Sequence, residues 1–206
     1  MKYIIMCGGW ACHQTEPKHF FQYEGKAIVE RTVALLHKHG VTDIAITTSP
    51  NCVEKYKVFG VEVIPYEADN RPFVWVDAFY PTDEPVCYIF GDVVFSDNAI
   101  KTIVETETDD IEFFASAPPF APEYPKNWAE PFAFKVANQE HFRQSIKMVL
   151  EGCNQHVWYR HPIAWELWQM IRMTPPNRII YTNYTAINDY TCDVDYYGEL
   201  QQWEKK

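Results

Sequence analysis

Two groups of carboxylates, far apart in the sequence, have the residue types that bind a divalent metal. Asp92 follows a nearly continuous apolar run, residues 86–90, which is typical of a parallel strand buried on both faces. Asp193 and Asp195 are two positions apart, so on a strand their side chains point the same way. Carboxylate oxygens are the protein ligands that Mg²⁺ prefers. These residues could hold a metal that stabilises the negative charge of phosphates during their transfer.

A second candidate site lies at the start of the chain. Gly8 and Gly9 follow the apolar residues 3–6, and Lys18 comes a short loop later. Paired glycines let backbone N–H groups approach an anion closely, and a lysine can neutralise its charge. A glycine pair alone more often marks a structural turn, but its combination with Lys18 favours nucleotide binding. The pattern therefore predicts a phosphate-binding loop at the end of the first strand.

The elements that must position these residues alternate between strands and helices. The expected strands are 3–6, 43–47, 61–65, 85–90, 112–115 and 132–136, and the expected helices are 25–40, 53–59, 71–80, 97–104, 139–150, 163–170 and a terminal one with Leu200 and Trp203. This rhythm is typical of right-handed βαβ units. It predicts an α/β fold: a three-layer α/β/α sandwich with a mainly parallel, Rossmann-like sheet.

Length and composition restrict the classes of protein to consider. A chain of 206 residues fits one domain, which we expect to have a nucleotide-binding half, 1–110, and an acceptor-binding half, 111–206. A net charge of −10 argues against a nucleic acid partner, because binding the phosphate backbone requires a basic surface. The six cysteines lack metal-ligand spacing, and no apolar run approaches the roughly 20 residues of a membrane span. We expect a cytoplasmic protein with no membrane partner and with reduced thiols.

Three segments together resemble a known family. The stretch that begins at Gly8, GGWACHQTEPKHFFQYEGKAIVERTVALL, resembles the nucleotide-binding signature of nucleotidyltransferases of the nucleotide-diphospho-sugar transferase (GT-A-like) superfamily. Residues 91–95 resemble the family's Gly-Asp-x-x-Phe segment, and residues 191–200 resemble its Asp-Ile-Asp-Thr-Pro-Glu-Asp-Leu ending. The chain departs from the family at His13, where members usually carry a triphosphate-binding arginine.

The resemblance implies a Mg²⁺-dependent sugar-phosphate nucleotidyltransferase. Such an enzyme moves a nucleoside monophosphate from a nucleoside triphosphate to a sugar phosphate or a related phosphate acceptor and releases pyrophosphate. The residues that the resemblance implies are Lys18 and Asp92 for catalysis, Gly8, Gly9, His13, Lys18 and Arg71 for the nucleotide, Trp128, Glu130 and Lys135 for the acceptor, and Asp92 and Asp193 for the metal.

Several alternatives stay open from the sequence. Asp195 could hold the metal in place of Asp193, although we prefer Asp195 as the cap of the terminal helix. Arg71 could compensate for the arginine that His13 replaces. A GT-A glycosyltransferase is an alternative function, but no Asp-x-Asp follows the strand at 86–90. A non-catalytic nucleotide-binding homologue is another, and a homo-oligomer is possible. The aromatic residues around 158–168 fit a core helix better than a sugar or choline-like site.

Overall fold

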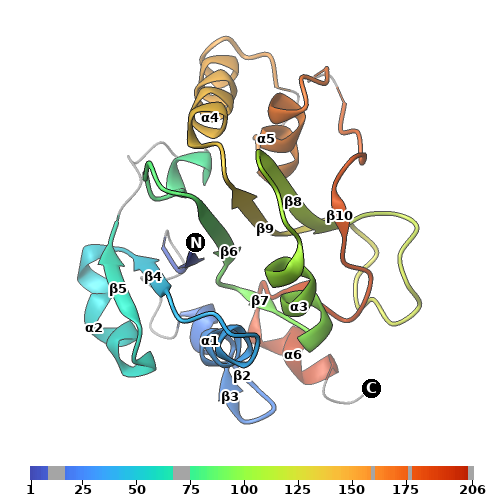
Figure 1. The fold of residues 1–206 in the computed structure, drawn as a ribbon. Helices are drawn as coiled ribbons and strands as arrows, with labels where there is room; N and C mark the ends of the chain where they lie inside the picture. The colour runs from blue at the N-terminus through green and yellow to red at the C-terminus, as the bar shows by residue number, and fades with distance from the viewer. Residues whose placement is uncertain (9–16, 67–74, 159–160, 176–177, 204–206) are drawn as a thin grey trace.

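The structure is a computed structural model that describes residues 1–8, 17–66, 75–158, 161–175 and 178–203 (Figure 1). Its strands are β1 (Lys2–Met6), β2 (Gln22–Tyr23), β3 (Lys26–Ala27), β4 (Ile44–Thr48), β5 (Glu62–Pro65), β6 (Val86–Phe90), β7 (Val93–Val94), β8 (Ile111–Ser116), β9 (Glu130–Val136), β10 (Thr185–Ala186) and β11 (Cys192–Asp193). Its α-helices are α1 (Ile28–Lys38), α2 (Val53–Tyr56), α3 (Asp97–Glu105), α4 (Gln139–Asn154), α5 (Ala164–Ile171) and α6 (Tyr197–Trp203). Short 3-10 helices span Lys18–Phe20, Pro50–Cys52, Lys57–Phe59 and Trp75–Ala78.

A seven-stranded sheet runs through the molecule in the order β10-β8-β9-β6-β1-β4-β5. β1 pairs in parallel with β4 and β6, β4 with β5, and β8 with β10. β9 is antiparallel to both β6 and β8. The expected mainly parallel sheet is confirmed, with β9 as the reversed strand. The segment before residue 111 supplies four of the strands, and the segment after it supplies β8, β9 and β10.

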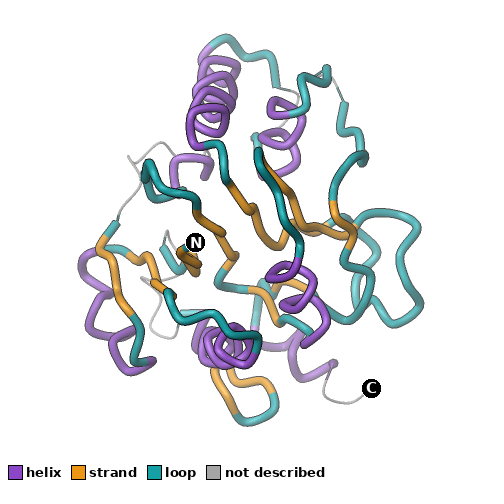
Figure 2. The backbone as a smooth tube through the Cα atoms, in the orientation of Figure 1, coloured by secondary structure: helices purple, strands orange, loops and turns teal. Residues whose placement is uncertain are grey.

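Helices cover both faces of this sheet (Figures 1 and 2). Neighbouring residues of a strand point to opposite faces. Ile5 of β1 therefore belongs to the core that contains Val33 of α1 and Ile100 of α3. Ile4 belongs to the other core, which contains Trp165 of α5 and residues of α4. The expected three-layer sandwich is confirmed.

Local sequence signals set the ends of several helices. α1 ends at Lys38, and Gly40 has the left-handed φ of +83° that glycine adopts without strain. Ser96 caps α3, because its hydroxyl accepts the Ala99 N–H at 2.8 Å. α4 continues to Asn154, four residues past its expected end. Among the described residues, no helix is both long and apolar enough to cross a membrane.

The helix expected over 71–80 differs from the structure. In the part of this segment that the structure describes, only Trp75–Ala78 is helical, and it is a 3-10 helix. The Asp77 carbonyl accepts a hydrogen bond from the Tyr66 hydroxyl at 2.8 Å, and the Tyr80 carbonyl accepts one from the Tyr88 hydroxyl at 2.5 Å. A helix that ended near residue 80 would leave both carbonyls without a partner inside the helix, and the two tyrosine hydroxyls supply partners for them.

Candidate active site

The carboxyl ends of β1 and β6 form the point from which the chain builds the sheet in two directions. After β1 the chain adds β4 and β5 on one side, and then it returns to place β6 on the other side of β1. In open α/β sheets, ligands bind in the crevice outside the strand ends at such a switch point. Gly8 lies two residues after β1, and Asp92 lies two residues after β6. The start of the expected phosphate loop and an expected metal ligand therefore lie at the same edge.

Gly91 fixes the position of Asp92. Its N–H donates to the Met6 carbonyl at 3.1 Å. A Cβ at Gly91 would lie 2.5 Å from both the Met6 carbonyl oxygen and Cys7 Sγ, which is closer than van der Waals contact allows. Only glycine lets the turn after β6 pack this tightly against the end of β1. The glycine of the Gly-Asp pair thus positions the carboxylate that follows it.

Lys18 and Asp92 form an ion pair in which Lys18 Nζ lies 2.5 Å from Asp92 Oδ2. Burial alone would raise the pKa of Asp92, but the Lys18 ammonium more than offsets it and the pKa is lowered. Burial alone would lower the pKa of Lys18, but the negative charge of Asp92 outweighs this effect, so the pKa of Lys18 is raised. Both groups are charged at neutral pH. The structure thus joins the candidate phosphate ligand to the candidate metal ligand.

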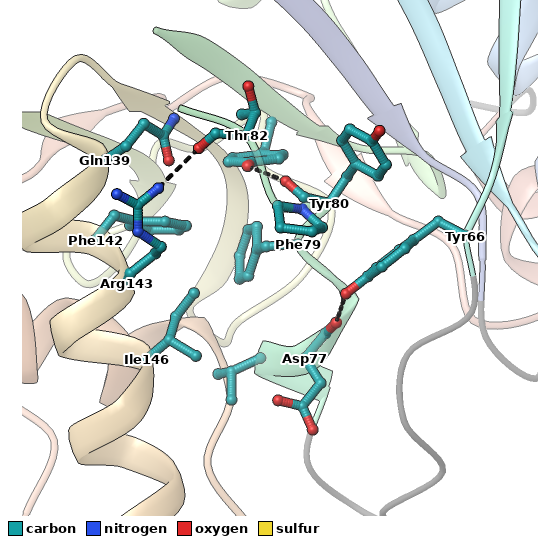
Figure 3. A pocket seen from close by; sticks show the side chains of 12 residues that line it. Tyr66, Asp77, Phe79, Tyr80, Thr82, Gln139, Phe142, Arg143 and Ile146 are labelled. Carbon is teal, nitrogen blue, oxygen red and sulfur yellow. Dashed lines mark hydrogen bonds between the residues drawn. The ribbon is translucent and has the colours of Figure 1, made fainter. Parts of the chain in front are cut away.

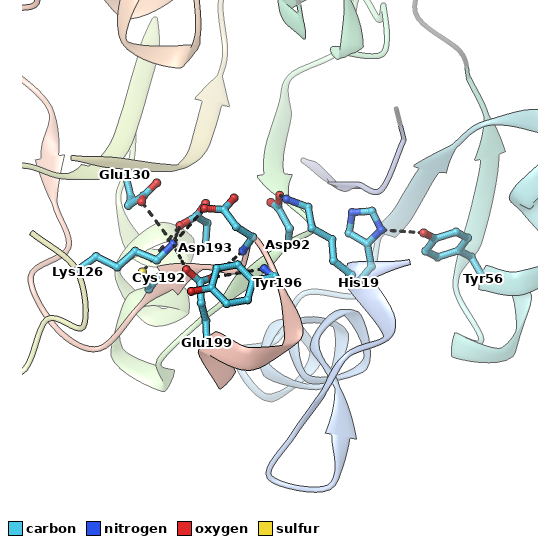
Figure 4. Close-up of polar contacts among 11 residues, drawn as sticks. His19, Tyr56, Asp92, Lys126, Glu130, Cys192, Asp193, Tyr196 and Glu199 are labelled. Atoms are coloured by element: carbon cyan, nitrogen blue, oxygen red, sulfur yellow. Dashed lines mark hydrogen bonds and ion pairs between the residues drawn. The ribbon is translucent and has the colours of Figure 1, made fainter. Parts of the chain in front are cut away.

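His19, next to Lys18, anchors this pair to the sheet (Figure 4). Its side chain is buried, and its Nδ1 lies 2.8 Å from the Tyr56 hydroxyl. The Tyr56 hydroxyl donates in turn to the Cys7 carbonyl just after β1, at 3.4 Å. Burial lowers the pKa of His19 to about 4, so the imidazole is neutral at pH 7. His19 therefore contributes a fixed hydrogen bond and no charge.

A short two-stranded ladder brings the C-terminal carboxylates to Asp92. β11 pairs antiparallel with β7, so that Asp193 lies opposite Val93. The Val194 N–H donates to the Asp92 carbonyl at 2.8 Å. The structure therefore brings Asp92 and Asp193, 101 positions apart in the sequence, to neighbouring places at one edge of the sheet.

A buried lysine lies among these carboxylates. The Lys126 ammonium contacts the four acids of what we call the Lys126 cluster: Asp193 at 2.5 Å, Glu130 at 3.7 Å, Asp195 at 3.8 Å and Glu199 at 3.8 Å. Only 4% of Lys126 is exposed. It also lies 5.1 Å from the centre of the Trp128 ring, and half of Trp128 is exposed. Two of the candidate acceptor residues, Glu130 and Trp128, thus contact Lys126, and Figure 4 shows Glu130 near Asp193.

Glu130 and Asp193 are not equivalent in charge. Burial and, secondarily, repulsion from Asp193 raise the pKa of Glu130 to about 9, so Glu130 is protonated at neutral pH. Burial also raises the pKa of Asp193, and Lys126 offsets part of this effect. Among the described residues, Glu130 Oε1 has no hydrogen-bond partner. The pair therefore holds a proton and an unused buried oxygen, both of which a polar ligand could use.

The two C-terminal aspartates differ in position. The Asp193 side chain is 20% exposed and the Asp195 side chain is 59% exposed. α6 begins at Tyr197, so the expectation that Asp195 directly precedes the terminal helix is wrong. It is the Glu199 carboxylate that accepts the Asp195 N–H, at 2.8 Å. Asp193 is therefore the more buried of the two carboxylates.

Lys135 lies away from this site, contrary to the expectation that it binds the acceptor. Because β9 is antiparallel to β6, Glu130 lies toward the carboxyl end of β6 whereas Lys135 pairs with Cys87 near its amino end. The Lys135 ammonium donates to the carbonyls of Val104 and Thr106 at 3.0 and 2.6 Å. Lys135 holds the end of α3 and is not proposed as an acceptor residue.

Three of the nucleotide residues implied by the resemblance, Gly9, His13 and Arg71, lie outside the described residues.

The aromatic segment around residues 158–168 is expected to be a core helix. Trp165 and Trp168 of α5 are almost fully buried in the core. The interpretation of this segment as a core helix is confirmed.

A pocket of about 270 Å³ lies on the α4 side of the sheet (Figure 3). Tyr66, Tyr80, Phe142 and Arg143 are among its lining residues. The Arg143 guanidinium donates to the Thr82 carbonyl at 3.1 Å and to an Asp83 carboxylate at 2.8 Å. Of the site residues implied by the resemblance, none that the structure describes lines this pocket. One lining residue, Tyr66, directly follows β5, and its carbonyl oxygen lies 3.9 Å from the position of a Cβ at Gly8.

Sequence reasoning missed Lys126 and His19. Lys126 lies in a proline-rich stretch without periodicity, and the only available signal was the spacing of four residues to Glu130. His19 follows Lys18 directly, but nothing in its sequence context indicates that Tyr56 is its partner.

Comparisons with known proteins place this geometry in context. No protein-family model matches the chain, and no curated protein matches its sequence. Among solved structures, it is similar to a protein from Bacillus anthracis named as a glucose-1-phosphate thymidylyltransferase, with 15% identity and a TM-score of 0.63 over 100% of this chain and 94% of that one. The inositol-1-phosphate CTP transferase from T. maritima has 16% identity and a TM-score of 0.60 over 98% and 93%. Rv0371c from Mycobacterium tuberculosis H37Rv has 12% identity and a TM-score of 0.55 over 100% and 97%. This chain therefore has the fold of the sugar-phosphate nucleotidyltransferases.

Proposed function

We propose that the chain is a Mg²⁺-dependent nucleotidyltransferase that moves a nucleoside monophosphate from a nucleoside triphosphate to a sugar phosphate and releases pyrophosphate. The observation that carries this proposal is the meeting of Lys18, Asp92 and Asp193 at the switch point of the sheet. Two similar structures are named for transfer reactions on glucose 1-phosphate and inositol 1-phosphate, which supports a phosphorylated polyol as acceptor.

The proposed metal ligands fit the ion. Asp92 and Asp193 offer carboxylate oxygens, which are the hard ligands that Mg²⁺ prefers. When bound, Mg²⁺ neutralises charge on the triphosphate and polarises the α-phosphate. Because Lys18 and Lys126 hold the two aspartates, each lysine must share or release its carboxylate when the metal and substrates bind.

The protein groups account for binding and orientation. Lys18 binds the triphosphate with backbone groups at Gly8 and, we propose, with Gly9, His13 and Arg71. The acceptor phosphate oxygen attacks the α-phosphorus in line, which forms the new P–O bond and breaks the bond to the bridging oxygen of pyrophosphate. No general base is required, because a phosphate acceptor is already ionised at pH 7. The Trp128 ring packs on the acceptor, and the Glu130 carboxyl group forms hydrogen bonds with the hydroxyl groups of the acceptor.

Pyrophosphate release tests this function. The purified protein is incubated with Mg²⁺, each of the four common nucleoside triphosphates and a panel of sugar 1-phosphates and inositol 1-phosphate. We expect release that requires both substrates and stops when EDTA removes the metal. Nucleotide binding without release in every combination would favour the non-catalytic alternative, and hydrolysis of nucleotide-sugars would favour the glycosyltransferase.

A further inference from the structure

Lys126 has an unusual environment for an ammonium group. Only 4% of the residue is exposed, and four carboxylates lie within 3.8 Å of its Nζ. The shortest contact, 2.5 Å, is to Oδ1 of Asp193, the proposed metal ligand. Besides the protonated Glu130, three carboxylates face this one positive charge; those of Asp193 and Glu199 are largely buried, whereas that of Asp195 is 59% exposed.

Glu130 adds a second, independent observation. It is more than nine-tenths buried, and its Oε1 has no hydrogen-bond partner among the described residues although it lies 3.7 Å from Lys126 Nζ. Ligand atoms of Glu130, Cys192 and Asp193 also lie within 4.8 Å of one another. A buried acceptor without a donor is costly, so this arrangement is suited to a further cation or donor.

We propose that Lys126 is an internal cation that competes with a divalent metal for Asp193 and thereby sets the metal affinity of the site. The inference rests on the proposed function in taking Asp193 as a metal ligand. Lys126 holds the carboxylates together in the absence of metal. Its charge opposes an incoming metal ion, both by repulsion and by neutralising the ligand that the ion needs.

The environment of Lys126 also indicates how the competition is relieved. The Trp128 ring lies over the ammonium, with its centre 5.1 Å from Nζ, and half of Trp128 is exposed. An acceptor phosphate that binds beside Trp128 would meet the ammonium and compete with Asp193 for it. Asp193 would then be free for the metal, so acceptor and metal would each favour binding of the other.

Metal binding to the nucleotide-free protein tests the proposal. Mn²⁺ replaces Mg²⁺ as the probe, because its free concentration can be followed directly by electron paramagnetic resonance. The Lys126→Met variant keeps the length of the side chain and removes its charge. We expect the dissociation constant for Mn²⁺ to fall by at least about tenfold, since a unit charge near 4 Å is removed from a partly buried site.

Lys135→Met is the matched control. Lys135 is also only 4% exposed, but its ammonium donates to the backbone carbonyls of Val104 and Thr106. This variant changes the net charge by the same amount, and we expect it to bind Mn²⁺ as the wild type does. In the double variant Lys126→Met, Asp193→Asn the gain should disappear. An unchanged Mn²⁺ affinity in Lys126→Met, or a gain that survives in the double variant, would overturn the proposal.

The variant could fail to fold, because four carboxylates lose their cation. A thermal scan by circular dichroism with and without Mn²⁺ covers this case. The proposal expects Mn²⁺ to restore a folding transition to Lys126→Met, and no recovery at millimolar Mn²⁺ contradicts it. These readouts do not use turnover. If the wild type releases pyrophosphate but Lys126→Met does not bind Mn²⁺ more tightly, only the role of Lys126 is rejected. If Lys126→Met binds Mn²⁺ more tightly but the wild type releases no pyrophosphate, only the proposed function is rejected.

Discussion

Asp92 forms an ion pair with Lys18, yet the proposed reaction needs its charge for a metal. Asp92→Asn removes that charge with almost no change in volume. We expect the variant to fold normally and to lose most Mg²⁺-dependent pyrophosphate release, measured at limiting Mg²⁺.

Asp97→Asn serves as the matched control, because Asp97 is exposed and pairs with Lys38 and His39 on the surface of the molecule. It should keep wild-type activity. Full activity in Asp92→Asn at limiting Mg²⁺ would show that the metal is held elsewhere.

Lys18 is the charged phosphate ligand in the proposed function. Lys18→Met should weaken binding of the nucleoside triphosphate by about 1.5–3 kcal/mol, the usual range for a lost hydrogen bond to a charged group. Isothermal titration calorimetry with a non-hydrolysable triphosphate measures this effect. Lys101→Met, which removes an exposed lysine from α3, controls for the change in net charge. Equal affinities in the two variants would argue against a role for Lys18 at the phosphates.

Glu130 gives the protein a specific pH dependence. Its pKa is about 9 in the folded protein, against an ordinary value of 4.5. Between these two pH values the folded protein keeps a proton that the unfolded chain releases, so this group lowers the free energy of unfolding as the pH rises. Glu130→Gln should flatten that decline. Urea denaturation at pH 5, 7 and 9 compares the two proteins, and parallel profiles would mean that Glu130 does not carry the proton.

At the scale of elements, the close packing of β1 against the turn after β6 is the feature on which the site depends. Gly91→Ala places a methyl group 2.5 Å from the Met6 carbonyl oxygen and Cys7 Sγ, and backbone cannot give way cheaply. We expect a loss of about 1–3 kcal/mol in the free energy of unfolding, the usual cost of overpacking. Chemical denaturation measures it.

Gly8→Ala is the matched substitution, because the nearest atom to a Cβ at Gly8 is the Tyr66 carbonyl oxygen at 3.9 Å. Its effect on stability should be clearly smaller. If both alanine variants were equally stable, the tight contact would not constrain the turn.

The elements also show what local patterns can and cannot predict. A buried strand followed by Gly-Asp was recognisable, because both the apolar run and the turn are encoded within about seven residues. The direction of β9 was not, since an apolar strand has the same pattern whichever way it runs. That direction decides the outcome for its two charged residues: Glu130 reaches the site and Lys135 does not.

At the scale of the whole molecule, the part of the site that could not be predicted is the part assembled from distant segments. Asp92 and Asp193 could be proposed one by one from short motifs, but Lys126, the lysine partner of Asp193, comes from the loop between β8 and β9. The fold of the sugar-phosphate nucleotidyltransferases agrees with the expected sandwich. The single-domain organisation, the cytoplasmic location and a homo-oligomer stay predictions.

The ladder between β7 and β11 has a consequence for synthesis of the protein. Asp193 is synthesised about a hundred residues after Asp92, so the two proposed metal ligands can come together only when the chain is nearly finished. Under the proposed function, a truncated product that ends before β11 would lack Asp193 and would not transfer a nucleotide.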